Sequence, residues 1–234
     1  MTHIIWDFNG TLLCDAQLSV DTDNYVFDAL GLPRITIEDY RRHMTMPVRD
    51  FYTALGVDLA RYPYETISRL WLDRFNRYAV DAGLVPGVLD VVRALHDAGI
   101  SQSVLSASYE PSLLHQCKHL GLVPYMRAIN GLHDESAEPK TEIGRRQLRT
   151  LGLDPAHTVL VGDMEADAAL ARALGTACVL VPWGHNSRER LMKTGFPVVE
   201  SCDALRARLL EGCACAGFIR DTGSACASAS GRRD

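Results

Sequence analysis

From Val85 to Glu211 the chain alternates short apolar stretches with amphipathic stretches, most of which end at a glycine. Such repeated strand–helix units require crossover connections, and they predict a mostly parallel sheet with helices on both faces. With the apolar run at the N-terminus included, strands are expected at 3–8, 100–108, 126–130, 157–163 and 177–184, and a short one at 197–200. Helices are expected at 88–98, 112–120, 141–151, 166–174 and 203–210.

Residues 15–82 have a different pattern, because helical stretches follow one another with no strand between them. They are expected at 23–30, 37–43, 47–55 and 64–79. Thr36 is a suitable N-cap for the second stretch, and Pro47 can open the third. The chain therefore divides into an α/β core (1–14 and 83–211), an all-helical insertion (15–82) and a tail rich in Gly, Ala, Ser and Cys (212–234), expected to be flexible.

Composition excludes several classes of function. The 234 residues carry a net charge of −5, so no basic surface for nucleic acid is expected. No apolar run reaches the length of a membrane span, no signal peptide is recognisable, and the seven cysteines lack the spacing of a zinc site or a disulfide framework. A cytoplasmic protein without a membrane or nucleic-acid partner is expected, as a monomer or a homodimer.

Polar residues follow four of the expected strands. Asp7 follows the first, Ser106 ends the second, Lys140 begins the helix after the third, and Asp163 with Asp167 follows the fourth. Because ligands of parallel sheets bind at the carboxyl ends of the strands, these side chains are expected to converge there. The chain has only three lysines, so an anionic ligand would depend on a bound metal or on one well-placed lysine.

In this order the residues resemble the four motifs of the haloacid dehalogenase-like hydrolases, a family dominated by Mg²⁺-dependent phosphatases. The family's Asp-x-Asp-Gly-Thr reads Asp7-Phe8-Asn9-Gly10-Thr11 here, and its Gly-Asp-x-x-x-Asp spans 162–167. Ser106 in "VLSAS" and Lys140 in "EPKTE" match the other two motifs. The resemblance covers residues 3 to about 211. It implies a Rossmann-like core whose insertion is the helical cap of phosphoglycolate-phosphatase-like members.

The resemblance also implies roles for these residues. Asp7 would attack phosphorus to form an aspartyl-phosphate that water then hydrolyses. Mg²⁺, which prefers oxygen ligands, would be held by Asp7, the backbone carbonyl of Asn9, Asp163 and Asp167. Lys140 and Ser106 would stabilise the transferring phosphoryl group. The expected substrate is a small phosphorylated metabolite, in contact with Gly10, Thr11 and Ala107 and with a cap residue.

The first motif departs from the family pattern at Asn9, where the family has a second acid. An amide neither gives up nor takes up a proton as a catalyst near neutral pH, and general acid–base help is typically worth ~10²–10⁴-fold. Simple alkyl phosphates are therefore expected to react slowly, unless another group replaces the acid. A group of the substrate itself or a cap residue such as His43 could replace the acid. A leaving group acidic enough to depart without a proton would not need one.

Substrate recognition is expected in the cap. Arg49, at the start of an expected helix, is our choice for a residue that faces the substrate, with Arg42 and His43 as alternatives. Trp183 and His185 follow the last strong strand, where they could line the rim of the cleft, and His185 is expected at the surface.

Other readings of the motifs stay open or are disfavoured. Asn9 motivates a catalytically weak or inactive member that binds a phosphorylated ligand in a regulatory role. A metal-independent dehalogenase is less favoured, because the pair Asp163 and Asp167 is intact. A phosphonate-cleaving enzyme would need a cap lysine, and no lysine precedes Lys118. A phosphomutase would need the second acid for return transfer.

Overall fold

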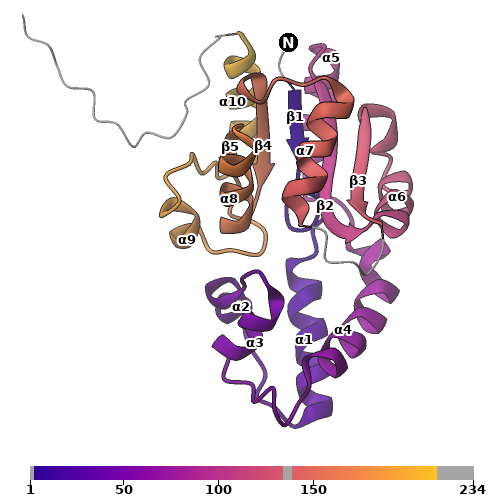
Figure 1. Ribbon diagram of the computed structural model, residues 1–234, viewed down its shortest axis with the longest axis vertical. Coiled ribbons are helices and arrows are strands. Elements are labelled where there is room, and N and C mark those ends of the chain that lie inside the picture. Colours follow the sequence, from indigo (N-terminus) through magenta and orange to yellow (C-terminus); the bar gives the residue numbers. More distant parts are fainter. Residues whose placement is uncertain (1–2, 134–138, 215–234) are drawn as a thin grey trace, which may run out of the picture.

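The computed structural model describes residues 3–133 and 139–214 (Figure 1). Five strands form one sheet in the order β3-β2-β1-β4-β5, and all four neighbouring pairs are parallel. This confirms the predicted parallel sheet and places the first strand at its centre. The strands are β1 (His3–Trp6), β2 (Ser101–Tyr109), β3 (Ala128–Leu132), β4 (Thr158–Gly162) and β5 (Ala177–Leu180).

Alternate residues of each strand pack into two separate hydrophobic cores, one on each face of the sheet. In β1, Ile4 and Trp6 belong to one core and Ile5 to the other, as the two-residue period of a strand requires. The first core is covered by α5 (Val88–Asp97), α6 (Glu110–His119) and α10 (Cys202–Ala214). The second is covered by α7 (Lys140–Leu151), α8 (Glu165–Leu174) and α9 (Arg188–Met192). Short 3₁₀ turns at Val123–Tyr125 and Pro155–His157 precede β3 and β4.

The chain between β1 and α5 forms a helical layer with its own apolar core (Figure 1). We call this layer, from α1 to α4, the cap. It contains α1 (Ala16–Leu30), α2 (Ile37–His43), α3 (Val48–Ala54) and α4 (Tyr64–Tyr78), followed by a 3₁₀ turn at Ala79–Ala82. Its two connections to the sheet lie side by side, since Leu13 pairs with Leu84 and the Cys14 amide donates to the Gly83 carbonyl.

Local signals identified several cap helices well. Thr36 caps α2 through a reciprocal capping box with Asp39, and Pro47 precedes α3 as expected. The first cap helix, in contrast, begins at Ala16 and not at Asp23 as expected. Its first turn is ordered by burial, because Ala16 and Val20 are buried.

The expected strand at 197–200 is wrong: only Val198 bridges to Leu180, and Pro197 has no N–H with which to extend the ladder. The tail expected at 212–234 lies outside the described residues from 215 onward, and up to Ala214 the chain is still in α10. No helix among residues 3–133 and 139–214 combines the length and apolar character needed to cross a membrane.

A buried carboxyl in the cap is expected to make stability depend on pH. Asp23 is 1% exposed and accepts a hydrogen bond from the Tyr52 hydroxyl at 2.9 Å. Burial raises the pKa of Asp23 from 3.8 to about 7, although the Tyr52 hydrogen bond opposes the rise. Between these values the unfolded chain has lost its proton while the folded chain keeps it. The contribution of Asp23 to the free energy of unfolding therefore falls as pH rises from about 4 to about 7.

The variant Asp23→Asn removes this dependence. Because one pH unit corresponds to about 1.4 kcal/mol, Asp23→Asn should gain about 3 kcal/mol relative to wild type between pH 5 and pH 8. Urea unfolding of both proteins at the two pH values measures this difference. Asp73→Asn, at an exposed site on α4, is the control and should follow wild type. Parallel pH profiles for Asp23→Asn and wild type would contradict the prediction.

Candidate active site

Asp7 lies immediately after the central strand, where it begins a tight loop. Its amide continues the ladder by donating to the Val161 carbonyl at 2.9 Å, and its side chain is largely buried. The loop then turns sharply, because the Phe8 carbonyl accepts hydrogen bonds from the amides of residues 11, 12 and 13. Gly10 has φ +71°, and a Cβ there would overlap the Asp163 carboxylate and the His185 ring. The turn therefore requires glycine.

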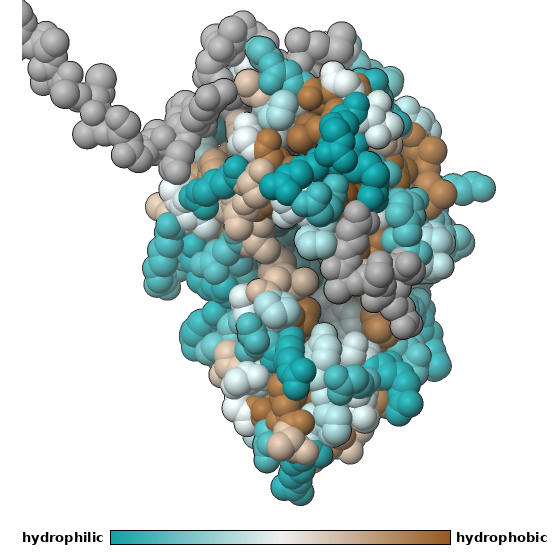
Figure 2. Space-filling model, in the orientation of Figure 1, coloured by the Kyte–Doolittle hydropathy of each residue, from teal (hydrophilic) through white to brown (hydrophobic). Residues whose placement is uncertain are grey.

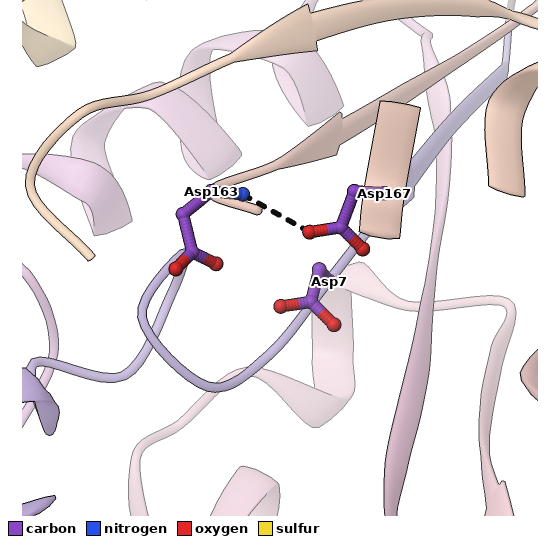
Figure 3. A group of neighbouring side chains, drawn as sticks. All are labelled: Asp7, Asp163 and Asp167. Carbon is purple, nitrogen blue, oxygen red and sulfur yellow. Dashed lines mark hydrogen bonds between the residues drawn. The ribbon is translucent and has the colours of Figure 1, made fainter. Parts of the chain in front are cut away.

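Asp163 and Asp167 come to Asp7 from the neighbouring strand. Asp163 follows β4, and Asp167 lies in the first turn of α8, where its Oδ2 accepts from the amides of Asp163 and Met164 at 3.2 and 3.1 Å. One oxygen from each of Asp7, Asp163 and Asp167 lies within 4.8 Å of the others. Figure 3 shows the three carboxylates around one common space. The predicted convergence of these side chains at the strand ends is therefore present.

Lys140 supplies a positive charge to this group. Its Nζ donates to Asp7 Oδ1 at 2.5 Å and to Asp167 Oδ1 at 2.9 Å, and its side chain is largely buried. Burial would lower the pKa of Lys140, but the two carboxylates outweigh burial and raise it. The two carboxyl groups therefore hold the ammonium group in its charged form.

Two of the three carboxyl groups, those of Asp7 and Asp163, have raised pKa values. Burial raises the pKa of Asp7 well above its usual value against the pull of Lys140, and the charges of Asp167 and Asp163 raise it further. Burial also raises the pKa of Asp163 to about 6. Lys140 and the His185 ring, which lies beside Asp163 and Asp15, supply fewer positive charges than these buried carboxyl groups can carry as anions. A divalent cation bound by oxygen ligands would offset the difference.

Asn9 is held by hydrogen bonds at both ends of its amide. Its Nδ2 donates to Asp15 Oδ2 at 2.7 Å, and its Oδ1 accepts from Ser108 Oγ at 2.7 Å. Ser106, the serine of the second motif, lies farther away, with its Oγ 3.5 Å from Asn9 Oδ1 and 3.1 Å from Ser108 Oγ. The amide of Asn9 is therefore a fixed part of the site.

The residues expected to contact the substrate differ in whether they are exposed or already hydrogen-bonded within the protein. The Gly10 amide donates to Asp15 Oδ1 at 2.7 Å, and Thr11 Oγ1 donates to Asp163 at 2.8 Å, so these donors are engaged within the protein. Ala107 is exposed on β2. Arg49 is exposed on α3, and no hydrogen bond or ion pair joins its side chain to the described site residues. The role proposed for Arg49 stays a prediction.

His185 is not at the surface, as expected, but buried at the centre of the site. It is 6% exposed, its amide donates to Asp163 Oδ2 at 2.6 Å, and its ring lies between Asp15 and the Tyr40 hydroxyl. Burial would lower the pKa of His185, but Asp15 and Asp163 raise it to about 9. The neighbouring Gly184 is required, because a Cβ there would overlap the Asp163 carboxylate and the Gly10 carbonyl.

The cap rests on the core through arginines that sequence reasoning did not select. From α2, Arg41 donates to the carbonyls of Trp183 and Gly184 at 2.8 and 2.9 Å. From α9, Arg190 donates to the Met44 carbonyl at 2.6 Å and pairs with Glu165. Figure 2 shows that the surface is hollowed between the core above and the cap below. No local sequence signal marks these arginines, because their partners, mostly backbone carbonyls, are distant in sequence.

The variant Arg190→Ala should loosen the contact between cap and core. Hydrogen bonds from a charged donor contribute about 1.5–3 kcal/mol, so a loss of about 2 kcal/mol in the free energy of unfolding is expected. Amide exchange in residues 37–46 should rise more than in β1. Hydrogen–deuterium exchange measures this, with Arg188→Ala as the control, since Arg188 pairs with Glu200 and makes no described contact with the cap. Equal exchange in both variants would contradict a role for Arg190 in holding the cap.

The fold and the site define the class of this protein. Residues 4–181 match the family model of the haloacid dehalogenase-like hydrolases, and the chain belongs to that family.

Two curated relatives share 25% and 27% of the aligned residues with this chain. The chain is 25% identical over 215 residues to a phosphoglycolate phosphatase of Mesorhizobium japonicum, covering 89% of this chain and 94% of the relative. It is 27% identical over 211 residues to the tyrosine-protein kinase PtkA of Mycobacterium tuberculosis, covering 88% and 72%. The fold is similar to that of a haloacid dehalogenase-like hydrolase from Streptococcus pneumoniae, with a TM-score of 0.77, 19% identity and coverage of 89% and 98%.

Proposed function

We propose that this protein is a Mg²⁺-dependent phosphatase that hydrolyses a small phosphorylated metabolite through an aspartyl-phosphate on Asp7. One observation carries the proposal: Asp7, at the end of the central strand, lies within 4.8 Å of two further carboxylates and bonds to Lys140 at 2.5 Å. A nucleophilic carboxylate, a set of oxygen ligands and a fixed cation are the parts that phosphoryl transfer requires.

The described residues fit a divalent metal. Asp7, Asp163 and Asp167 offer oxygen atoms only, as Mg²⁺ prefers, and their excess negative charge favours a cation. In this proposal these three residues and the backbone carbonyl of Asn9 hold the metal. When bound, Mg²⁺ supplies charge that screens the phosphoryl group from the carboxylates.

The residues of this chain then have the following roles. A carboxylate oxygen of Asp7 attacks phosphorus, and the bond between phosphorus and the leaving oxygen breaks. Lys140 offsets the negative charge of Asp7 and of the phosphoryl oxygens, and Ser106 donates a hydrogen bond to one of these oxygens. Water then attacks the phosphorus of the aspartyl-phosphate, and the bond between phosphorus and the Asp7 oxygen breaks. Both protons of the water leave with the phosphate, and the Asp7 carboxylate is restored.

Asn9 restricts the leaving group. Its amide is not an acid near neutral pH and has no proton to transfer, so the leaving oxygen departs without help from this position. Leaving groups that are stable anions, such as phenolates, carboxylates and phosphate, need no such help, whereas alkoxides do. We therefore propose that the substrate carries an acidic leaving group, and that the cap, which rests on the core beside the site, limits it to a small molecule.

A phosphate-release screen tests the proposal. A panel of aryl, acyl and alkyl phosphates and phosphoanhydrides is assayed with Mg²⁺ and with EDTA. Turnover with Mg²⁺, faster for the acidic leaving groups, is expected. Because one relative is named a tyrosine-protein kinase, transfer of the phosphoryl group to a tyrosine hydroxyl is the alternative outcome, and phosphate release distinguishes water from such an acceptor. Binding of phosphorylated ligands without turnover on the whole panel would favour a ligand-binding member instead.

A further inference from the structure

Asp15 is a buried carboxylate that neither the first motif nor the metal group uses. It stands at the N-cap position of α1, where an aspartate usually accepts a hydrogen bond from its own helix. Here its side chain makes no capping hydrogen bond, although it is only 1% exposed. Its oxygens instead accept from Asn9 Nδ2 and from the Gly10 amide, each at 2.7 Å. Asp15 is therefore directed back toward the loop that carries Asp7.

The surroundings of Asn9 require a donor on one side and an acceptor on the other. Nδ2 faces the Asp15 carboxylate, and Oδ1 faces the hydroxyl of Ser108. An amide meets both requirements in one orientation. An aspartate at position 9 would place two carboxylate oxygens against each other at the position of a 2.7 Å hydrogen bond, and an ionised carboxylate offers no hydrogen to the pair.

We propose that Asp15 is a positioning residue for the phosphatase reaction, and that Asn9 and Asp15 form an exchanged amide–carboxylate pair. Asp15 fixes the amide of Asn9 and the backbone of Gly10, and with them the loop that presents Asp7. This inference rests on the proposed phosphatase function and adds to it. Asn9 is then matched to Asp15, and it is not a simple loss of the family's acid.

Exchanging the two residues should preserve the hydrogen bonds that join them to each other, to the Gly10 amide and to Ser108. The oxygen of the new amide at position 15 also stays beside His185 Nε2, which lies 3.5 Å from Asp15 Oδ1. In Asn9→Asp/Asp15→Asn, the new amide at position 15 can donate to the new carboxylate at position 9 and still accept from the Gly10 amide. The carboxylate at position 9 can still accept from Ser108. Either single substitution breaks the match, because Asn9→Asp opposes two acceptors. Asp15→Asn keeps only one of its two hydrogen bonds, since its oxygen can face either Asn9 Nδ2 or the Gly10 amide.

The test compares wild type, both single variants and the double variant, with p-nitrophenyl phosphate and Mg²⁺. Each single variant should lower kcat roughly 10- to 100-fold, because small displacements of a nucleophile have effects of this size, with KM changed less than about threefold. The double variant should recover at least about a third of the wild-type kcat. Recovery of kcat by the exchange separates positioning from a general loss of stability. Asp21→Asn, at an exposed site on α1, should behave as wild type.

If Asp15→Asn does not fold, Asp15→Ser takes its place for the single substitution and should lower kcat in the same way. An active wild type whose kcat rises with Asn9→Asp alone would overturn this inference but not the phosphatase. If wild type is active and the double variant loses as much kcat as the two single losses combined, this inference is overturned and the phosphatase function is not. A wild type that releases no phosphate from the probe or from any compound of the panel would overturn the proposed function, and this inference with it.

Discussion

Replacing Asp7 by asparagine is expected to lower kcat by about 10⁴-fold or more, because an amide lacks the nucleophilic oxygen and an enzyme without its nucleophile loses effects of this size. Asparagine has nearly the same shape, so the substitution leaves the loop at the end of β1 in place. Phosphate release at saturating substrate with Mg²⁺ measures the effect. The control is Asp21→Asn, which makes the same chemical change at an exposed site on α1.

The same variant should not be destabilised. Burial and the neighbouring acids raise the pKa of Asp7, so its charged form is disfavoured in the folded protein when no metal is bound. In EDTA, the midpoint temperature of unfolding of Asp7→Asn should therefore be equal to or higher than that of wild type. A variant that folds and retains activity within tenfold of wild type would exclude Asp7 as the nucleophile.

Removal of the divalent metal is expected to have the second-largest effect. Electrostatic stabilisation by a metal contributes several kcal/mol, so EDTA should lower kcat by about 10³-fold, and added Mg²⁺ should restore it. Binding is measured independently of activity. Mg²⁺ should raise the unfolding temperature of wild type, because a ligand that binds only the folded state stabilises it, and it should fail to do so for Asp163→Asn.

The control for metal binding is Asp203→Asn, on α10 and exposed. It should keep the full response to Mg²⁺, because it removes an equal charge at an unrelated place. An equal response to Mg²⁺ in wild type and Asp163→Asn would contradict the proposed metal ligands. Activity unchanged by EDTA would contradict the metal dependence itself.

The core of the fold could be predicted from local signals. The apolar runs, the glycine stops and the alternation of strand and helix are properties of short segments, and they identified all five strands of the sheet. The carboxyl ends of neighbouring parallel strands must meet, so the convergence of Asp7, Asp163 and Lys140 also followed from the order of the elements. Thr36 and Pro47 marked two helix starts, because capping and the fixed φ of proline act over a few residues.

The rest depended on contacts between distant segments. His185 is buried because Tyr40, 145 positions away, packs against its ring from the cap. The sequence contains an aspartate at position 15 but does not reveal that α1 directs its carboxylate back to Asn9. The expected strand at 197–200 had the right composition, yet Pro197 limited it to a single bridge. Such features arise from tertiary packing, which composition and spacing do not describe.

The most direct test of the central claim is to trap the covalent intermediate. Wild type is mixed with Mg²⁺ and a substrate identified by the panel, quenched in acid during turnover, and treated with borohydride, which reduces an acyl phosphate to an alcohol. Mass spectrometry of the peptide that contains "WDFNG" should then show homoserine at position 7, absent without substrate and absent in Asp7→Asn. Unmodified Asp7 in protein quenched during rapid turnover, or the modification on another carboxylate, would contradict the account.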